Sequence, residues 1–248
     1  MKISLITCTY NSGETLADTF DSVREQVSPP DEYIVVDGGS HDNTLEIIAE
    51  NSDIVSKWIS EADQGIYDAM NKGIRMAGGD IIGFLHSDDI LASKTSLKLI
   101  RDTFEAEKCD AVYGDLQYVK RNDPSEVVRH WKSCSYSPGL FLRGWMPPHP
   151  TFYLKNDLYV KYGTYDTSFK ISADYELMLR MMAKHKVRAR YIPEVLVKMR
   201  TGGVSNVSVK NRLTANREDM LAWRKNGLKP GLFTRFLKPL SKLRQFSP

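Results

Sequence analysis

The chain has 248 residues, an ordinary globular composition and a formal net charge of +3 at pH 7. This length suits one large α/β domain or two small ones, and no apolar run approaches the length that crosses a bilayer. Three cysteines without paired metal-ligand spacing, and an N-terminus without a secretory signal, lead us to expect a cytoplasmic protein.

The positive charge is concentrated at the C-terminus. No acidic residue follows Asp219, whereas seven lysine and arginine residues do, and removing those seven charges from +3 leaves −4 for the rest. The body of the chain therefore lacks a basic character of its own, and we expect no nucleic-acid partner.

In the first half, β-prone apolar runs alternate with helical periodicity. We expect strands at residues 3–9, 32–37, 54–60 and 81–86, and helices at residues 16–27, 44–51 and 66–77. Strands that alternate with helices at such short intervals favour a mainly parallel sheet with right-handed crossovers.

The second half alternates less regularly. We expect helices at 94–108, 156–162, from Ser172 onward and at 211–225, and strands at 110–120, 127–131, 151–154, 188–192 and 195–200. The intervening segment 133–150 is rich in aromatic residues, proline and glycine, which suits an irregular wall over a site.

Polar side chains follow three of the predicted strands at their ends: Thr9-Tyr10-Asn11, Asp37, and the pair Asp88 and Asp89. Parallel topology brings these ends to one edge of the sheet, where open α/β sheets bind ligands. There an aromatic ring can stack on a base, a carboxylate can accept a base N–H, and hard carboxylate oxygens suit Mg²⁺ or Mn²⁺. On spacing alone, Asp88 has an equal alternative as the cap of a following turn or helix.

Two common nucleotide-binding classes are disfavoured by the first turn. It reads Thr-Tyr-Asn-Ser-Gly, without the glycine-rich fingerprint of a dinucleotide fold, and no phosphate-cradling P-loop occurs. The sequence therefore argues against an oxidoreductase or a kinase.

Four segments, at 3–11, 32–40, 63–73 and 85–89, resemble in order and spacing the motifs of the family 2 inverting glycosyltransferases. The resemblance implies a GT-A fold: an α/β architecture with a Rossmann-like, mainly parallel central sheet, helices on both faces and a smaller acceptor-side region. It also implies a nucleotide-sugar donor, a Mn²⁺ or Mg²⁺ cofactor and an acceptor sugar hydroxyl. The donor-binding half would be residues 1–115, the acceptor and base half 116–227, and the tail 228–248.

The resemblance also implies roles for single residues. Tyr10 and Asp37 would hold the nucleobase, usually uracil, and Asp88 would bind the metal. The other positions implied at the donor are Thr9, Asn11, Asp63, Gly65, Asn71, His86 and Ser87.

Two positions depart from the family pattern. His86 occupies the first position of the usual Asp-x-Asp motif, either as a neutral ligand or ribose partner, or as a spacer under the donor. Met70 stands where many relatives have an arginine that faces the diphosphate. Lys72 or the segment from Arg200 onward would supply the missing positive field, unless Lys72 lies on a solvated helix face.

Inverting transfer is a single displacement and requires a carboxylate base for the acceptor hydroxyl. Asp166, Asp174 and Glu176 are the candidates, and we choose Asp174 because its Ala-Asp sequence at a helix start resembles the family's base motif. The alternative is a helix N-terminal charge that faces the helix dipole. By resemblance and composition, His149 and Trp145 are expected on the acceptor or diphosphate side, each with a core position as its alternative.

The basic tail has apolar residues at three- and four-residue spacing between positions 233 and 246, a pattern typical of a helix on an anionic membrane surface. Docking on the chain's own domain or on an oligomer partner is the alternative. A peripheral position at the inner face of the membrane would suit an acceptor linked to a polyprenyl diphosphate.

Two other functions compete with glycosyl transfer. A nucleotide-sugar or glycan binding module without turnover would be consistent with His86 and Met70. A nucleotidyltransferase would release pyrophosphate, but no glycine-rich basic phosphate loop opens the chain.

Overall fold

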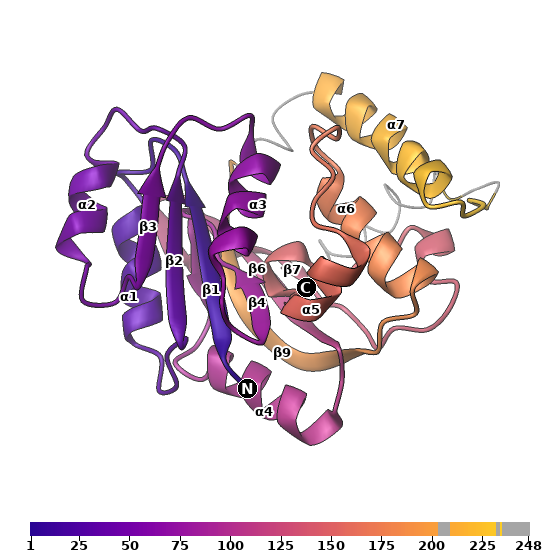
Figure 1. The fold of residues 1–248 in the computed structure, drawn as a ribbon, viewed down its shortest axis with the longest axis horizontal. Coiled ribbons are helices and arrows are strands. Elements are labelled where there is room, and N and C mark those ends of the chain that lie inside the picture. The colour runs from indigo at the N-terminus through magenta and orange to yellow at the C-terminus, as the bar shows by residue number, and fades with distance from the viewer. Residues whose placement is uncertain (203–208, 232–233, 235–248) are drawn as a thin grey trace.

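The computed structural model describes residues 1–202, 209–231 and 234. Within these residues, nine strands form one mixed sheet in the order β3-β2-β1-β4-β8-β6-β9-β5, and β7 pairs with β6 at one side (Figure 1). The strands are β1 (Ile3–Thr9), β2 (Glu32–Asp37), β3 (Lys57–Ser60), β4 (Ile81–Phe84), β5 (Asp89–Leu91), β6 (Ala111–Lys120), β7 (Asp123–Trp131), β8 (Tyr153–Lys155) and β9 (Ala189–Arg200).

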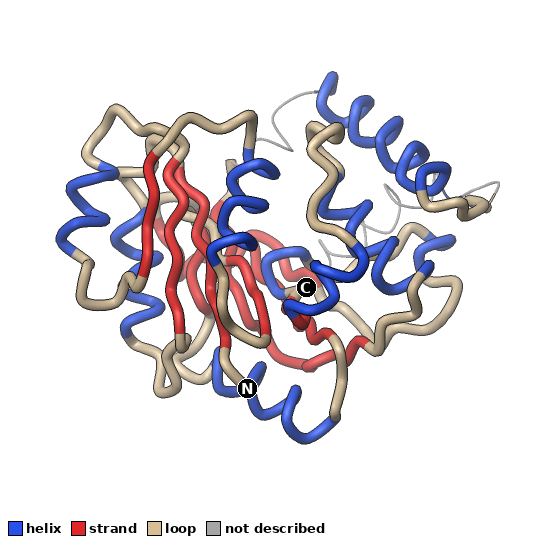
Figure 2. Tube along the Cα trace, viewed as in Figure 1, coloured by secondary structure: helices blue, strands red, loops and turns tan. Residues whose placement is uncertain are grey.

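The helices surround this sheet, as the blue and red tube of Figure 2 shows. They are α1 (Leu16–Arg24), α2 (Thr44–Glu50), α3 (Ile66–Met76), α4 (Ser96–Glu107), α5 (Asn156–Tyr162), α6 (Ala173–Met178) and α7 (Val209–Lys225). Short 3₁₀ turns occupy Phe141–Arg143 and His149–Thr151, and a π-helical turn, Leu179–Lys184, continues α6.

Strands β3, β2, β1 and β4 are mutually parallel, which confirms the mainly parallel sheet expected for the first half. Side chains alternate across β1, so that Leu5 packs toward α1, α2 and α4, while Ile6 packs toward α3 and α6. Both faces are thus covered, and this explains the uninterrupted apolar run. Gly73 brings α3 close to β1, because a Cβ there would lie 2.5 Å from Cγ2 of Ile6.

Antiparallel pairings connect β4 to β8 and β8 to β6, while β9 returns parallel to β6. The two strands predicted at 188–192 and 195–200 were wrong, because they form the single strand β9. Its register with β6 shifts between Tyr113/Tyr191 and Asp115/Val195, and Pro193 lies in the extra residues. A proline that lacks a ladder donor is tolerated at such a bulge, whereas in the sequence it reads as a strand end.

Several other boundaries differ from the prediction; for example, β3 begins at Lys57 rather than at residue 54, and β7 begins at Asp123 rather than at residue 127. Helix α1 ends at Arg24, and Val27 is exposed; β4 ends at Phe84; and β8 begins at Tyr153. The division at residues 115 and 116 stays a prediction, and β6 runs across it.

Most of the predicted tail 228–248 lies outside the described residues. In the part of the chain that is described, no helix combines the length and apolarity that a membrane span requires.

Candidate active site

The ends of β1 and β2 lie side by side, with Thr9 and Asp37 as register partners. Asp37 is fully buried, whereas the Tyr10 ring, one residue past β1, is 58% exposed. Asn11 has a left-handed φ of 47° and joins the two strand-end loops, because its N–H donates to Ser40 Oγ (2.8 Å) and its Oδ1 accepts from the His41 N–H (2.9 Å). The exposed aromatic ring is thus held over a rigid edge.

The Asp37 carboxylate organises the loop that follows β2. Its Oδ2 accepts the backbone N–H groups of Gly39 (3.0 Å) and Ser40 (2.9 Å) and the hydroxyl of Ser60 (2.6 Å), while its Oδ1 accepts from Ser40 Oγ. A buried carboxylate requires such donors. Asp37 therefore fixes the geometry of this edge of the sheet.

Asp63 faces Tyr10 across Gly38. A Cβ built on Gly38 would lie 2.5 Å from Asp63 Oδ2 and 3.4 Å from Tyr10 Cδ2, so the absence of a side chain at Gly38 lets Asp63 and Tyr10 approach the backbone there closely. Asp63 Oδ1 accepts the N–H of Gly65 (2.8 Å), whose φ of 111° suits glycine at the start of α3. We call the region between Tyr10, Gly38 and Asp63 the nucleoside slot, after the base-binding role that the resemblance implies for Tyr10.

Filling the nucleoside slot should weaken nucleotide binding without unfolding the protein. We expect Gly38→Ala to lower the affinity for UDP by about 10- to 100-fold, the range for a few kcal/mol of lost contact. The fold should survive because the atom it meets is the end of the Asp63 side chain. Calorimetry with UDP checks the affinity, and Gly78→Ala, where a Cβ would lie at an ordinary contact distance of 3.8 Å from Glu32 Oε1, is the control. Unchanged UDP affinity in Gly38→Ala would contradict the slot.

Asp88 lies in the turn between β4 and β5. Among the described residues, no hydrogen-bond donor contacts its carboxylate. The next residue, Asp89, is buried, and burial, followed by the Asp88 charge, raises the pKa of Asp89 well above its usual range. The two adjacent carboxyl groups are therefore unequal, and Asp88 is the one available to a ligand.

The backbone of this turn is braced from α1 and β9. Thr15 Oγ1 donates to the Ser87 carbonyl (2.8 Å), Thr19 Oγ1 donates to the Asp89 carbonyl (2.8 Å), and the hydroxyls of Ser12 and Ser87 are hydrogen bonded (2.8 Å). These threonines and Ser12 were not predicted, because their spacing reads only as part of a helix start.

Arg200 supplies another brace. It is 2% exposed, donates from Nε to the Arg121 carbonyl (2.9 Å) and from Nη1 to the Asp88 carbonyl (3.4 Å), and forms an ion pair with Asp18. We expected Arg200 on the acceptor or diphosphate side, yet its nitrogen atoms are occupied within the protein. We therefore interpret it as a support of the Asp88 turn.

A row of rings runs from this turn toward α6. The rings of His86 and His149 are stacked with centroids 6.0 Å apart, and His149 Nε2 is hydrogen bonded to the hydroxyl of Tyr165 (2.7 Å), which stacks on Tyr67. The pKa of both histidines is lowered to about 4: at His149 the cause is burial, and at His86 the causes are burial and then the proximity of His149, which the Asp88 charge opposes. Both imidazoles are therefore uncharged at neutral pH and offer hydrogen bonds rather than positive charge.

Asp174 lies in the first turn of α6, near the far end of this row. Its Oδ1 accepts the N–H of Tyr175 (2.7 Å). Its negative charge helps to raise the pKa of the Tyr67 and Tyr165 hydroxyls, after the larger effect of burial. The structure thus places His86 close to Asp88 and to His149, and Asp174 close to Tyr67 and Tyr165 at the other end of the row.

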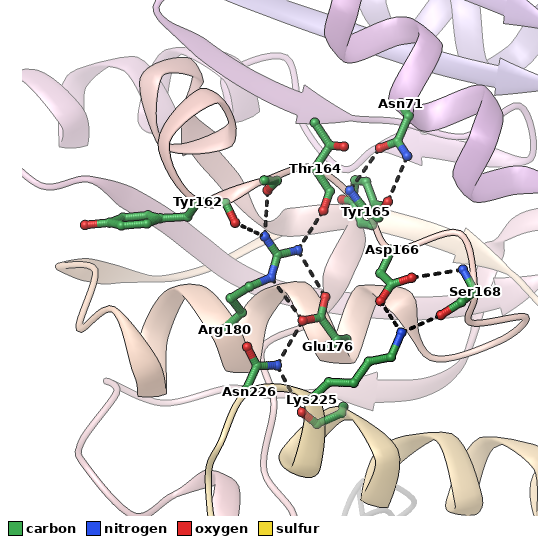
Figure 3. A network of polar contacts seen from close by, with 12 residues as sticks. Asn71, Tyr162, Thr164, Tyr165, Asp166, Ser168, Glu176, Arg180, Lys225 and Asn226 are labelled. Atoms are coloured by element: carbon green, nitrogen blue, oxygen red, sulfur yellow. Dashed lines mark hydrogen bonds and ion pairs between the residues drawn. The ribbon is translucent and has the colours of Figure 1, made fainter.

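Asn71 connects α3 to the same region. Its side-chain amide donates to the Tyr165 carbonyl (2.8 Å) and accepts the Tyr165 N–H (2.9 Å), as the upper right of Figure 3 shows. Asn71 is 6% exposed. The residue expected at the donor therefore aligns the segment that contains Tyr165.

Trp145 packs within an aromatic cluster. Its ring contacts those of Tyr113, Tyr136 and Phe141 at centroid distances of 5.6–5.8 Å. These contacts match the core alternative for Trp145, although its Nε1 is buried without a partner among the described residues.

The residues around Asp88 fit a divalent ion that is shared with a substrate. No group of three or more His, Cys, Asp or Glu in the described ranges is arranged to hold a metal by itself. Mg²⁺ and Mn²⁺ sites on phosphate substrates need only one or two protein carboxylates, since phosphate oxygens and water complete them. Asp88 meets that requirement. Two residues before it in the sequence, His86 Nδ1 is buried without a partner and could serve as a nitrogen ligand.

Comparison with known proteins identifies the family. A model described as glycosyl transferase family 2 matches residues 4–172, which is more than half of the chain. The chain belongs to glycosyl transferase family 2. An uncharacterized glycosyltransferase of Mycobacterium tuberculosis is 33% identical over 180 residues, which cover 72% of this chain and 68% of that relative. The predicted family is thus confirmed, and with it a glycosyltransferase that uses a nucleotide sugar.

Two solved structures share the fold of this family 2 glycosyltransferase. TarS 1-349 of S. aureus, in complex with UDP, has a TM-score of 0.68 at 18% identity, over 100% of this chain and 72% of that chain. A mannosyltransferase of Pyrobaculum calidifontis, in complex with GDP-Man and Mn²⁺, has a TM-score of 0.66 at 20% identity, over 98% of this chain and 69% of that chain. These likenesses confirm the predicted GT-A fold.

Proposed function

We propose that this family 2 glycosyltransferase is an inverting enzyme that transfers a hexose or an N-acetylhexosamine from a UDP-linked donor to a hydroxyl of a glycan or of a polyprenyl-diphosphate-linked glycan. The observation that carries the proposal is the nucleoside slot of Tyr10, Gly38 and Asp63, at the same sheet edge as the Asp88 carboxylate. The fold neighbour that was solved with UDP adds support.

In this proposal, Tyr10 stacks on the base and Asp63 lines the slot, while the buried Asp37 holds the loop beside it. The Asp88 carboxylate would hold Mn²⁺ or Mg²⁺, which neutralises the charge of the diphosphate when bound. The fold neighbour with GDP-Man and Mn²⁺ supports a divalent ion. The uncharged His86 and His149 line the path between the diphosphate and Asp174.

Asp174 acts as the base. The acceptor oxygen forms a bond to the anomeric carbon, the bond from that carbon to the diphosphate oxygen breaks, and the diphosphate leaves with the electron pair. The hydroxyl proton passes to the Asp174 carboxylate. The configuration inverts because attack and departure occur on opposite faces of the sugar.

The C-terminal tail indicates where the acceptor would be met. The basic amphipathic sequence of the tail supports an anionic membrane surface as a partner and a peripheral position at the inner face of the membrane. A lipid-linked acceptor would be presented at that surface.

Donor binding with and without metal tests the proposal. With a UDP-sugar at about 100 times its Kd, we expect mass action to raise Tm by about 5–10 °C. Asp88→Asn should lose the part of this rise that depends on Mn²⁺ and retain the part that UDP gives alone. Asp80→Asn, at the opposite end of β4, is the control, and equal Mn²⁺ dependence in the wild type and in Asp88→Asn would contradict the metal assignment.

A second function is a binding module without turnover, which the histidine at position 86 favours. It predicts the same rise in Tm. It differs in releasing no UDP when donor, Mn²⁺ and glycan acceptors are supplied together.

A further inference from the structure

Helix α7 lies along α6 in the structure (Figure 1). Three residues of α7, and Asn226 one residue beyond the end of the helix, reach α6 or the segment before it. The Ala215 carbonyl accepts from Ser172 Oγ (3.3 Å), Trp223 Nε1 donates to Tyr175 Oη (2.9 Å), and Asn226 Nδ2 donates to Glu176 (2.9 Å). The remaining residue is Glu218, and Ala215, Glu218 and Trp223 lie on the same side of α7.

Glu218 accepts three consecutive backbone N–H groups just before α6. Its Oε1 accepts from Lys170, and its Oε2 accepts from Ile171 and Ser172, each at 2.9 Å. Hydrogen bonds to a charged acceptor are stronger than neutral ones. One carboxylate of α7 therefore fixes the backbone that leads into the turn with Asp174.

The same backbone is held from the opposite side by α3. The Ile171 carbonyl accepts from the Tyr67 hydroxyl (2.6 Å), while the Ile171 N–H donates to Glu218. Burial and the nearby Asp174 charge raise the pKa of Tyr67, so this hydroxyl remains a donor. Ile171 is thus held by hydrogen bonds between α3, which starts next to the nucleoside slot, and α7.

We propose that Glu218 is a positioning residue for the transfer reaction: through the N–H groups of residues 170–172 it sets the orientation of the Asp174 carboxylate toward the acceptor hydroxyl. The inference rests on the proposed function, in which Asp174 is the base. The Glu218 side chain contacts neither the nucleoside slot nor the Asp88 turn. A substitution of Glu218 should therefore affect the chemical step and not the binding of UDP.

Steady-state kinetics of the full chain tests this inference. In Glu218→Gln, one of the two accepting oxygens becomes an amide nitrogen that cannot accept an N–H. We expect kcat to fall by about 10- to 100-fold, as for a displacement of roughly 1 Å, while the donor KM and the Kd of UDP stay within about twofold. A residue with a merely structural role would lower Tm and the folded fraction but leave kcat per UDP-binding site unchanged.

A matched control lies in the same segment. Asp166 also bridges to α7, through Lys225 (2.7 Å), but this pair is partly exposed and precedes the clamped residues (Figure 3). Asp166→Asn should leave kcat within about twofold, because exposed ion pairs contribute little.

Tyr67→Phe keeps the inference testable if Glu218→Gln does not fold, because it removes one hydroxyl from the other side of residue 171. We expect a smaller fall in kcat at unchanged UDP affinity. If Asp174→Asn is inactive, a normal kcat in Glu218→Gln overturns the inference. When Glu218→Gln cannot be obtained as a folded protein, a normal kcat in folded Tyr67→Phe overturns it instead. Normal kcat in Asp174→Asn instead overturns the base assignment itself.

Discussion

Replacing Asp174 by asparagine should lower kcat by about 10²- to 10⁴-fold, the usual contribution of a general base. The amide cannot take the proton of the acceptor hydroxyl, yet it keeps the shape of the side chain and an oxygen that accepts the N–H of Tyr175. The Kd of UDP should not change, because the nucleoside slot lies at the ends of β1 and β2. Initial rates of UDP release and calorimetry with UDP measure the two quantities.

The specificity of that result depends on the nearby acids. Asp166 is paired with Lys225, and Glu176 is buried against Arg180, so neither is available as the base. Asp166→Asn is therefore the matched loss of a carboxylate and should retain most of the activity. A rate close to that of the wild type in Asp174→Asn would remove Asp174 from the mechanism.

Arg180→Met should destabilise the protein by about 3–5 kcal/mol, the cost of leaving a buried charge without its partner. Arg180 forms a two-point ion pair with Glu176, with both N···O distances at 3.0 Å, and donates to the carbonyls of Tyr162, Gly163 (2.7 Å) and Thr164 (2.6 Å) (Figure 3). Methionine fills similar space but donates nothing. For a protein of this size, Tm should fall by about 6–20 °C, as measured by calorimetry.

An exposed pair provides the comparison. Arg188 also makes a two-point contact, with Asp110, but its side chain is 68% exposed. Arg188→Met should cost about 0–1 kcal/mol. If the two variants unfold at the same temperature, burial does not decide the stability that the Arg180 network contributes.

The sequence predicted the elements that local periodicity encodes. Apolar runs that are covered on both faces gave β1, β2 and β4, and helical spacing gave α3 and α4 with ends close to those observed. Errors occurred where a local signal has two meanings. Pro193 marks a bulge within β9 rather than the end of a strand, and Val27 lies beyond the last turn of α1.

For the candidate site, the sequence likewise predicted which residues lie at the sheet edge but not where each side chain points. Tyr10, Asp37 and Asp88 follow predicted strands, and parallel pairing alone requires them to share an edge. The direction of an individual side chain does not follow from that rule. Arg200 was expected at the ligand, but it lies beneath the Asp88 turn because Asp18 and two carbonyl groups surround it.

By itself, the sequence therefore predicted the alternating strands and helices, because periodicity is local, and its motifs carried the resemblance to the family that the family model confirmed. The tertiary structure alone decided which polar groups meet across long separations. It placed Glu218 on the backbone of residues 170–172, Asn71 on Tyr165, and Asp63 in close approach to Gly38 beside Tyr10. Such contacts leave no periodic trace in a single sequence, since each depends on how two distant elements pack.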